Sequence, residues 1–359
     1  MRYLNGLEPA GLVGHFIAHP PENFSAFTTT AGIPVFLADF DLLTTADKGA
    51  KDFLARLPAA TWLRRHLTWP TFFAGATVTE YLPLPEGTAA SLVGELLNFW
   101  ARRSRLLVLK DIPLASPLLP ATERDAAAAF LAACRQRGFI PVEGQALAYV
   151  DIDFASADDY LSRLSPGRRK DIRRKLRSRG DIRIEVRETG HAQFRDPAFL
   201  AHLYALYKEV YAQSELHFDK LTAAFFAAVF QDASLDGRVF LYFHGEELIG
   251  FNLCFIHGGM LIDKFVGFRY PDARRHNLYF ISWLENLEFA RRHGLTHYVA
   301  GWTDPQIKAY LGAKFTFTQH AVYVRNPVLR FVLKRLSRHF ESDRTWFDEH
   351  ARKTVSPRP

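Results

Sequence analysis

The alternation of hydrophobic and polar residues divides the chain into strands and helices, most clearly after residue 105. Short apolar runs bounded by Gly or Pro predict strands, and longer segments with Ala and Phe at helical spacing predict helices. Two passages share the order strand, helix, strand: residues 105–113, 123–138 and 147–154, and residues 259–268, 277–294 and 296–302. In each passage the first strand contains a lysine and the helix ends with Arg-x-x-Gly. This similarity predicts an internal repeat of two α/β units.

Three further segments lie between these two passages. Residues 165–180 predict a basic helix, with Ser165 as the N-cap, Pro166 in the first turn and eight basic residues from Arg168 to Arg179. Two helices follow, and the first of them is amphipathic and carries Tyr207 and Tyr211. Residues 238–268 then predict three antiparallel strands joined by Gly-containing turns.

Composition limits the class of protein. With 359 residues, of which 48% are hydrophobic and 23% charged, the chain is long enough for two packed units, and no apolar run reaches the ~18 residues that span a bilayer. The N-terminus lacks the pattern of a secretory signal, so we expect a cytoplasmic protein. Cys134 and Cys254 are the only cysteines, and the 14 histidines lack metal-ligand spacing, so we expect no disulfide framework and no metal. The net charge of +7 predicts an anionic partner: a phosphate-bearing cofactor, a membrane surface or a nucleic acid.

The end of the chain predicts an amphipathic helix. Over residues 326–340 one face carries Leu, Val and Phe and the other carries Arg and Lys. Such a helix can lie at a membrane interface with its cations on anionic lipid, or it can pack on the protein core.

The order of motifs in the second half resembles a known family. A three-stranded meander, the helix that begins "NLYF", a strand, and then Gly-x-Thr ahead of Lys-x-x-Leu-Gly-Ala is similar to the FemAB-like and acetyltransferase 6 (BioF2-like) branches of the GNAT superfamily of N-acyltransferases. The resemblance covers roughly residues 155 to 325. The matching positions are Arg168, Lys170, Arg173, Asn277, Leu278, Tyr279, Gly301, Thr303, Lys308, Leu311 and Gly312.

The resemblance implies an α/β (α+β) fold of tandem GNAT-like units, each a mixed, mainly antiparallel sheet flanked by helices. We expect a structural or acceptor-binding unit at residues 1–150, an acyltransferase unit at 151–325, and the basic amphipathic helix and tail at 326–359. The sequence departs from many GNAT enzymes at residues 271–277, "PDARRHN", where a Gly-rich pyrophosphate turn is absent.

The chemistry of acyl transfer selects candidate residues. A deprotonated amine must meet the carbonyl, and the departing thiolate needs a proton. Alternation along the strand sends one of Asp263 and Lys264 to the face opposite Ile262 and Phe265. Asp263 is the candidate general base, or alternatively part of an ion pair on an exposed strand face. Tyr279 and Tyr310 are candidate acids, and Lys308 brings a cation one turn into the helix that Pro305 begins.

Other residues are candidates for binding. A helix N-terminus presents free N–H groups and partial positive charge, so the head of the "NLYF" helix predicts a pyrophosphate seat. The cofactor-binding candidates are Arg274, Arg275, His276, Asn277 and Thr303. The substrate-binding candidates are Arg168, Arg173, Tyr207, Tyr211, Asn252 and Trp302.

These observations together predict a metal-free N-acyltransferase. The donor is acyl-CoA or an acyl-carrier-protein thioester, and the acceptor is a primary amine, for which a lipid or sphingoid-type amine with a ceramide-like product fits the basic tail. We expect peripheral contact with the inner face of an anionic membrane and no nucleic-acid partner. The alternatives are a FemAB-type aminoacyl-tRNA-dependent transferase for peptidoglycan or peptide precursors, and a non-catalytic GNAT scaffold that binds a membrane surface or nucleic acid.

Overall fold

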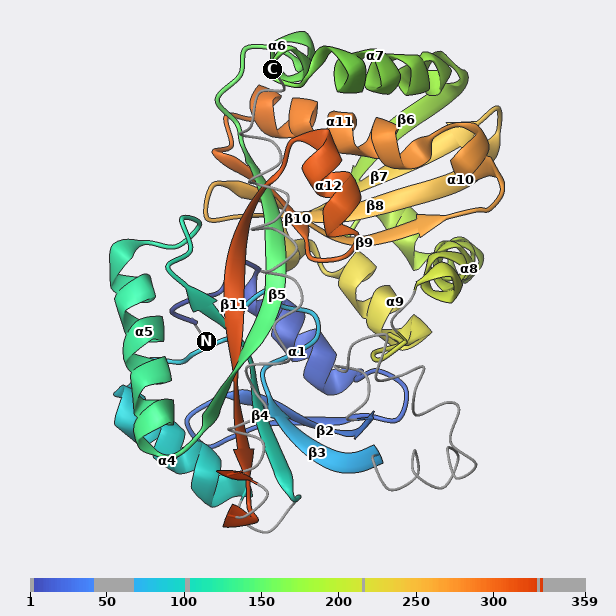
Figure 1. Cartoon of the computed structure of the whole chain (residues 1–359). Coiled ribbons are helices and arrows are strands. Elements are labelled where there is room, and N and C mark those ends of the chain that lie inside the picture. Colours follow the sequence, from blue (N-terminus) through green and yellow to red (C-terminus); the bar gives the residue numbers. More distant parts are fainter. Residues whose placement is uncertain (1–2, 42–67, 101–103, 215–216, 328–329, 332–359) are drawn as a thin grey trace, which may run out of the picture.

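The computed structural model describes residues 3–41, 68–100, 104–214, 217–327 and 330–331. Within these residues the strands form one mixed sheet of eleven strands, in the order β1-β2-β3-β4-β11-β5-β10-β9-β8-β7-β6. Every neighbouring pair is antiparallel except β3 with β4 and β9 with β10. Helices flank the sheet along its length (Figure 1), which confirms the predicted fold class.

The first half of the chain contributes one end of the sheet. Its elements are α1 (Ala10–Ala18), β1 (Ser25–Thr28), β2 (Pro34–Asp41), β3 (Thr68–Ala74), α4 (Ala89–Trp100), β4 (Leu106–Leu114), α5 (Ala121–Gln136) and β5 (Ile140–Asp151).

The second half contributes the other end. Its helices are α6 (Ala157–Ser162), α7 (Pro166–Lys175), α8 (Pro197–Gln213), α9 (Ala223–Gln231), α10 (Asp272–Arg275), α11 (Leu278–Arg292) and α12 (Pro305–Leu311), with short 3₁₀ turns η2 (Leu176–Asp181), η3 (Ala192–Arg195) and η4 (Ala233–Leu235). Its strands are β6 (Ile182–Glu188), β7 (Gly237–His244), β8 (Glu247–His257), β9 (Met260–Phe268), β10 (His297–Gly301) and β11 (Lys314–Val324).

The strand order reveals two similar units that exchange their last strands. One unit runs β3, α4, β4, α5, β5, and the other runs β9, α11, β10, α12, β11. In each unit the first two strands are parallel neighbours joined through a helix. The last strand of each unit then pairs antiparallel with a strand of the other, because β5 lies beside β10 and β11 lies beside β4. The β5–β11 pair in the middle joins the units into one sheet.

The predicted repeat is present, but its alignment was wrong by one strand. We aligned residues 105–154 with residues 259–302, yet β9 and β10 are parallel neighbours whereas β11 separates β4 from β5. The passage from β9 to β10 therefore corresponds to the passage from β3 to β4. Each unit contains the pattern strand, helix, strand twice, and hydropathy alone does not distinguish a parallel crossover from an antiparallel return.

Local signals placed the elements of the second half correctly. Ser165 is the N-cap of α7 and Pro166 lies in its first turn. Thr222 caps α9, since its Oγ1 accepts a hydrogen bond from the Phe225 N–H (3.2 Å). The predicted meander is β7, β8 and β9. The predicted C-terminal helix at residues 326–340 lies mostly outside the described residues. None of the described helices combines the length and hydrophobicity that crossing a membrane requires.

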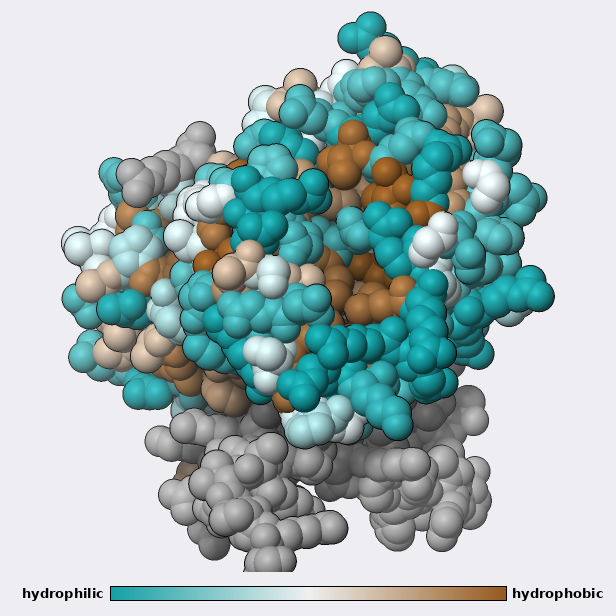
Figure 2. Space-filling model, turned by 90° about the horizontal axis from the view of Figure 1, so that it is seen from above, coloured by the Kyte–Doolittle hydropathy of each residue, from teal (hydrophilic) through white to brown (hydrophobic). Residues whose placement is uncertain are grey.

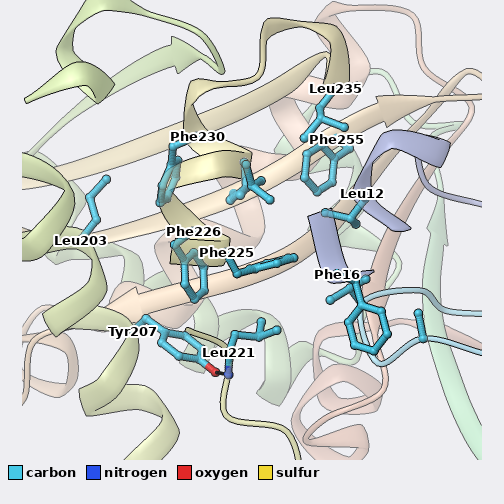
Figure 3. Packing of buried hydrophobic residues seen from close by; sticks show 14 of the residues in the cluster. Leu12, Phe16, Leu203, Tyr207, Leu221, Phe225, Phe226, Phe230, Leu235 and Phe255 are labelled. Carbon is cyan, nitrogen blue, oxygen red and sulfur yellow. Dashed lines mark hydrogen bonds between the residues drawn. The ribbon is translucent and has the colours of Figure 1, made fainter. Parts of the chain in front are cut away.

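A hydrophobic cluster packs side chains of both units together (Figure 3). Leu12 and Phe16 of α1 belong to the same buried cluster as Phe225 and Phe226 of α9 and Phe255 of β8. Other clusters bury the faces of α6, α7 and α11 and of α4 and α5 against the sheet. Because the first cluster spans the junction, the two units share apolar burial, which is the main stabilising contribution to folding.

The sheet opens where β9 and β10 separate. These strands pair only from Met260 to Ile262 against His297 to Val299. Directly afterwards β9 is bulged, since Cys254 of β8 faces Asp263 while Leu253 faces Phe265. Ligands in α/β sheets bind beyond the carboxyl ends of diverging parallel strands, so this opening is the natural place for a site.

Candidate active site

A small pocket of about 80 Å³ lies at the opening between β9 and β10. It is bounded by side chains from β8, β9, α11, β10 and the start of α12. The lining residues are Asn252, Asp263, Lys264, Val266, Tyr279, Ser282, Trp283, Tyr298, Ala300, Thr303 and Lys308. The structure therefore brings together Asp263, Tyr279, Lys308, Asn252 and Thr303, which the sequence selected from four separate segments.

Asp263 is held by a dense set of hydrogen bonds. The Asn252 side-chain amide donates to both carboxylate oxygens (3.2 Å each), and Asp263 Oδ2 also accepts from Tyr298 (2.8 Å) and Asn286 (3.1 Å). Burial raises the pKa of Asp263, and the bonds from Tyr298 and Asn252 oppose that shift. A carboxylate accepts roughly four hydrogen bonds. Because four are made, this geometry favours Asp263 as an anchor for its neighbours over Asp263 as a base.

The bulge in β9 changes the expected alternation. We expected strand alternation to send only one of Asp263 and Lys264 towards the site, but both line the pocket. Lys264 is the residue that has no partner opposite it in β8. An extra residue in one strand interrupts the period of two, which hydropathy does not reveal.

Lys308 is a buried cation at the pocket wall. It projects from the first turns of α12, is only 4% exposed, and donates to the Ala300 carbonyl (2.6 Å). Burial lowers its pKa to about 8, although Asp263 and Glu80 oppose the shift. Gly301, beside it, has φ of 75°, and a Cβ there would lie 3.9 Å from Lys308 Nζ. The backbone thus passes the ammonium group without a side chain in between, because a side chain is disfavoured at this φ.

Two predicted residues hold α12 in place. Arg168 of α7 donates to the Tyr310 carbonyl (2.7 Å from Nε) and the Ala309 carbonyl (2.7 Å) near the end of α12. The Tyr310 hydroxyl donates to Asp171 Oδ2 (2.8 Å). Neither Arg168 nor Tyr310 lines the pocket. Their contacts instead orient the helix that carries Lys308. A cation at the C-terminal end of a helix also complements its free carbonyls.

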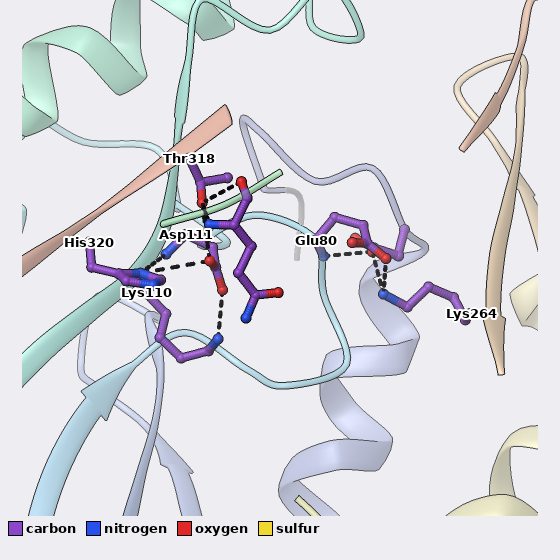
Figure 4. Close-up of polar contacts among 8 residues, drawn as sticks. Glu80, Lys110, Asp111, Lys264, Thr318 and His320 are labelled. Atoms are coloured by element: carbon purple, nitrogen blue, oxygen red, sulfur yellow. Dashed lines mark hydrogen bonds and ion pairs between the residues drawn. The ribbon is translucent and has the colours of Figure 1, made fainter. Parts of the chain in front are cut away.

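A buried ion cluster from both units borders the pocket (Figure 4). Lys264 Nζ contacts Glu80 Oε1 and lies 3.1 Å from Glu8 Oε1. The Glu80 backbone N–H also donates to Glu8 Oε1 (2.7 Å). Burial raises the pKa of Glu8 to about 7 against the effect of Lys264. Burial lowers the pKa of Lys264, but Glu80 and Glu8 outweigh it and raise that pKa above the usual range.

A second polar cluster in Figure 4 lies where β3 and β4 separate. Asp111 pairs with Lys110 (Nζ to Oδ2, 2.6 Å), and its other carboxylate oxygen accepts from Thr318 (3.2 Å). Its backbone N–H donates to His320 Nδ1 (3.0 Å). These contacts join β4 to β11, so they fasten the exchanged strand to the first unit.

The predicted pyrophosphate seat lies before α11. Arg274 and Arg275 end the short helix α10 and are exposed, while His276 is buried with its ring against His244 (4.4 Å between centroids). Asn277 is the N-cap of α11 with φ of 53°. The α11 N-terminus remains a predicted seat, and the two arginines beside it are its exposed cations.

The other predicted substrate contacts lie outside the pocket. Tyr207 and Tyr211 of α8 pack into or against the cluster shared by the units, and the Tyr207 oxygen accepts from the Leu221 N–H (3.1 Å). Trp302 packs on a separate apolar cluster that contains Tyr81 and Tyr149. Arg173 pairs with exposed Asp158 (2.8 Å). Most tyrosines at helical spacing belong to a core, and these two do.

The basic helix α7 forms a charged hollow on the surface. Its lining residues are Pro166, Arg169, Lys170, Arg173, Arg174 and Arg177. The end of this helix adjoins the start of α11, because Lys175 Nζ lies 4.0 Å from the Phe280 ring centroid and Ser178 donates to the His276 carbonyl (2.6 Å). Figure 2 views the molecule from this end and shows a hollow with exposed hydrophobic side chains surrounded by hydrophilic ones.

Sequence reasoning missed several residues of the site. Tyr298 and Asn286 lie in a strand and a helix that read as ordinary core. Glu8 and Glu80 come from the first unit, 256 and 184 residues from their partner Lys264. Their sequence signal was weak: a single acidic residue in an otherwise apolar or small-residue stretch. No group of His, Cys, Asp and Glu in the described part of the chain is arranged to hold a metal ion.

The structure resembles solved proteins along most of its length. The C-terminal domain of a putative lysylphosphatidylglycerol synthetase from Agrobacterium fabrum superposes with a TM-score of 0.51 at 13% identity, covering 89% of this chain and 94% of that chain. L-PGS from Bacillus licheniformis gives 0.51 at 11% identity, covering 92% and 97%. FemX gives 0.47 at 12% identity, covering 90% and 98%. At these identities the first two matches show a shared fold.

A family model assigns the second unit. The model described as an acetyltransferase (GNAT) domain matches residues 166–309, which contain the whole of β9, α11 and β10 and all of the residues that line the pocket. A comparison with curated proteins gave no match. The resemblance inferred from the motifs is thereby confirmed, because residues 166–309 match an acetyltransferase (GNAT) domain.

Proposed function

We propose that this protein is an N-acyltransferase that moves an acyl group from acyl-CoA, or from an acyl-carrier-protein thioester, to a primary amine. The observation that carries the proposal is the buried Lys308 beside the Asp263 network, at the point where the two parallel strands of a GNAT domain separate. A cation that is desolvated there interacts strongly with negative charge that develops in a transition state.

Three pocket residues have different roles in the proposed reaction. The Lys308 ammonium group is positioned to stabilise the oxyanion that forms when an amine attacks the acyl carbonyl. Burial raises the pKa of Tyr279, so its phenol is protonated at neutral pH and can supply a proton to the departing group. Asp263 holds Asn252 and Tyr298 and keeps negative charge near Lys308.

The donor would approach along the basic surface. Arg274 and Arg275 precede α11, whose first backbone N–H groups favour anions. A phosphate-bearing carrier held there would direct its acyl group towards the opening between β9 and β10. A lipid or sphingoid-type amine remains our proposed acceptor, and peripheral contact with an anionic membrane through residues 326–340 is part of the same proposal.

The test is acyl transfer by the purified chain, measured as free thiol released from acetyl-CoA and palmitoyl-CoA with short and long primary amines. We expect amine-dependent thiol release that falls at least about a hundredfold in Lys308→Met, the loss typical when one transition-state donor is removed. Lys208→Met, a change of the same kind at an exposed residue outside both pockets, controls for charge. Equal turnover in Lys308→Met and the unchanged chain would refute the assignment.

The basic hollow of α7 favours a second candidate, aminoacyl transfer from a charged tRNA. Neighbouring arginines and lysines suit the phosphates of an RNA backbone. Under this alternative the same assay would show no thiol release from acyl-CoA, whereas radiolabelled amino acid would pass from aminoacyl-tRNA to an amine, with a rate that falls steeply as salt is added.

A further inference from the structure

The charges that surround the pocket are unequal in number. In the buried ion cluster two carboxyl groups, Glu8 and Glu80, share one amino group, Lys264. Buried charges are stable only when paired, because removing an ion from water is costly. The pocket region therefore has room for one further positive charge, although the protein as a whole carries a net charge of +7.

The unpaired charge is located on the first unit. Glu8 and Glu80 are 4% and 2% exposed, and each has one carboxylate oxygen, Oε2, that is buried and has no hydrogen-bond partner in the described structure. Asp263, by contrast, uses both its oxygens. A buried carboxylate oxygen without a donor is unfavourable unless a ligand or water supplies one.

Glu80 also lies close to the pocket, whose wall includes its partner Lys264. A Cβ placed on Gly301 would lie 3.9 Å from Glu80 Oε1 and 3.9 Å from Lys308 Nζ. Glu80 and the proposed oxyanion-stabilising lysine are therefore both within van der Waals reach of the position where Gly301 lacks a side chain. A ligand group here would contact the first unit and the second unit together.

We propose that the acceptor enters as an ammonium ion and that Glu80, with Glu8, is its binding site. The inference rests on the proposed acyl transfer for its chemistry, but the binding site is defined by the buried oxygens alone. The first unit then contributes the recognition of the acceptor, and the GNAT domain contributes Lys308 and the donor side.

The pair also provides a destination for the proton. One proton passes from the ammonium ion to the Glu8–Glu80 pair, which leaves a neutral amine. The amine nitrogen then bonds to the acyl carbon, the bond from that carbon to the carrier sulfur breaks, and the nitrogen loses its second proton as the thiolate gains one. The raised pKa of Glu8, about 7, suits a group that takes up a proton near neutral pH.

The experiment measures binding before turnover. Hexylamine and hexanol have nearly the same shape and differ in charge, so calorimetric titration of both reports recognition of the ammonium ion. We expect the unchanged chain to prefer hexylamine, and Glu80→Gln to lose that preference by on the order of ten- to a hundredfold, the value of a hydrogen bond to a charged group. Glu86→Gln, the same change at an exposed site of the same unit, should keep it.

Two variants separate binding from structure. Glu80→Gln leaves Lys264 paired with Glu8 alone. If this change destabilises the fold, Glu80→Gln combined with Glu8→Gln and Lys264→Met removes all three charges and should recover stability without recovering the preference for the amine. A preference unchanged in a folded Glu80→Gln chain, or absent from the unchanged chain, overturns the proposal. Loss of amine binding in Glu80→Gln without any acyl transfer by the unchanged chain would refute the proposed function and leave the ammonium site standing.

Discussion

The buried charge of Lys308 should lower the free energy of unfolding at neutral pH, and Lys308→Met should remove this effect. The folded protein lowers its pKa from 10.5 to about 8. The charged form is therefore disfavoured in the fold by about 3 kcal/mol at pH 7, at about 1.4 kcal/mol for each pKa unit. Lys308→Met removes this penalty but leaves the Ala300 carbonyl without its donor, which costs about 1–2 kcal/mol.

The sign of the pH dependence follows from proton binding. Between pH 8 and pH 10.5 the unfolded chain keeps the Lys308 proton and the folded chain does not, so stability rises with pH over this interval. The penalty of about 3 kcal/mol at pH 7 should fall to about 1 kcal/mol at pH 10. Lys308→Met lacks this contribution, and its advantage over the unchanged chain should shrink by about 2 kcal/mol.

Urea unfolding, followed by tryptophan fluorescence, measures the free energy of unfolding of both chains at pH 7 and pH 10. The test is whether the difference between the two chains changes with pH. Other titrating groups contribute equally to both chains, and the lost hydrogen bond contributes equally at both pH values. Both contributions therefore cancel in this comparison. Lys170→Met is the control, because Lys170 is exposed and its removal should change stability equally at both values. If the advantage of Lys308→Met is the same at pH 7 and pH 10, Lys308 is not a desolvated cation and its proposed role loses its physical basis.

Three further predictions concern activity. The rate should follow a bell-shaped pH profile that rises near pH 7 as Glu8 ionises and falls near pH 8 as Lys308 loses its proton. Asp263→Asn should move the alkaline limb to lower pH, because the Asp263 charge raises the pKa of Lys308. If the acid limb moves instead, Asp263 is the base. Gly301→Ala should lower stability by about 1 kcal/mol in urea unfolding, since φ is positive. It should also raise KM for the amine, because the added methyl group would lie beside Glu80; an unchanged KM would contradict binding of the acceptor there. Arg168→Met should lower kcat while KM for the donor stays constant, because it loosens α12; a selective rise in donor KM would show direct binding.

Much of the second unit could be predicted from sequence because its signals are local. Ser165 with Pro166 starts α7, Gly294 follows the end of α11, and the turn glycines separate β7, β8 and β9. Lys308 could be predicted as well, since Pro305 and Gly312 bracket a short helix directly after a strand.

The remaining parts of the site depend on contacts that no local pattern contains. The bulge at Lys264 results from pairing with β8, and alternation within β9 alone predicts the opposite arrangement. Glu8 and Glu80 reach Lys264 only because the two units pack against each other across a shared apolar cluster. Arg168 looked like a ligand contact because a charged residue in a basic run gives no sign that it serves as a helix cap.

The exchange of strands explains why the GNAT match contains the residues that line the pocket but not all of the contacts that support them. Residues 166–309 contain Asp263, Lys264 and Lys308, yet β10 pairs with β5 from the first half of the chain. The carboxylates that neutralise Lys264 also come from the first unit, and removing them would leave a buried cation without a partner, which is strongly destabilising. The first unit thus contributes both the strand that pairs with β10 and the carboxylates that neutralise Lys264. The acyltransferase domain therefore depends on the first unit for its stability and, under our proposal, for binding its acceptor.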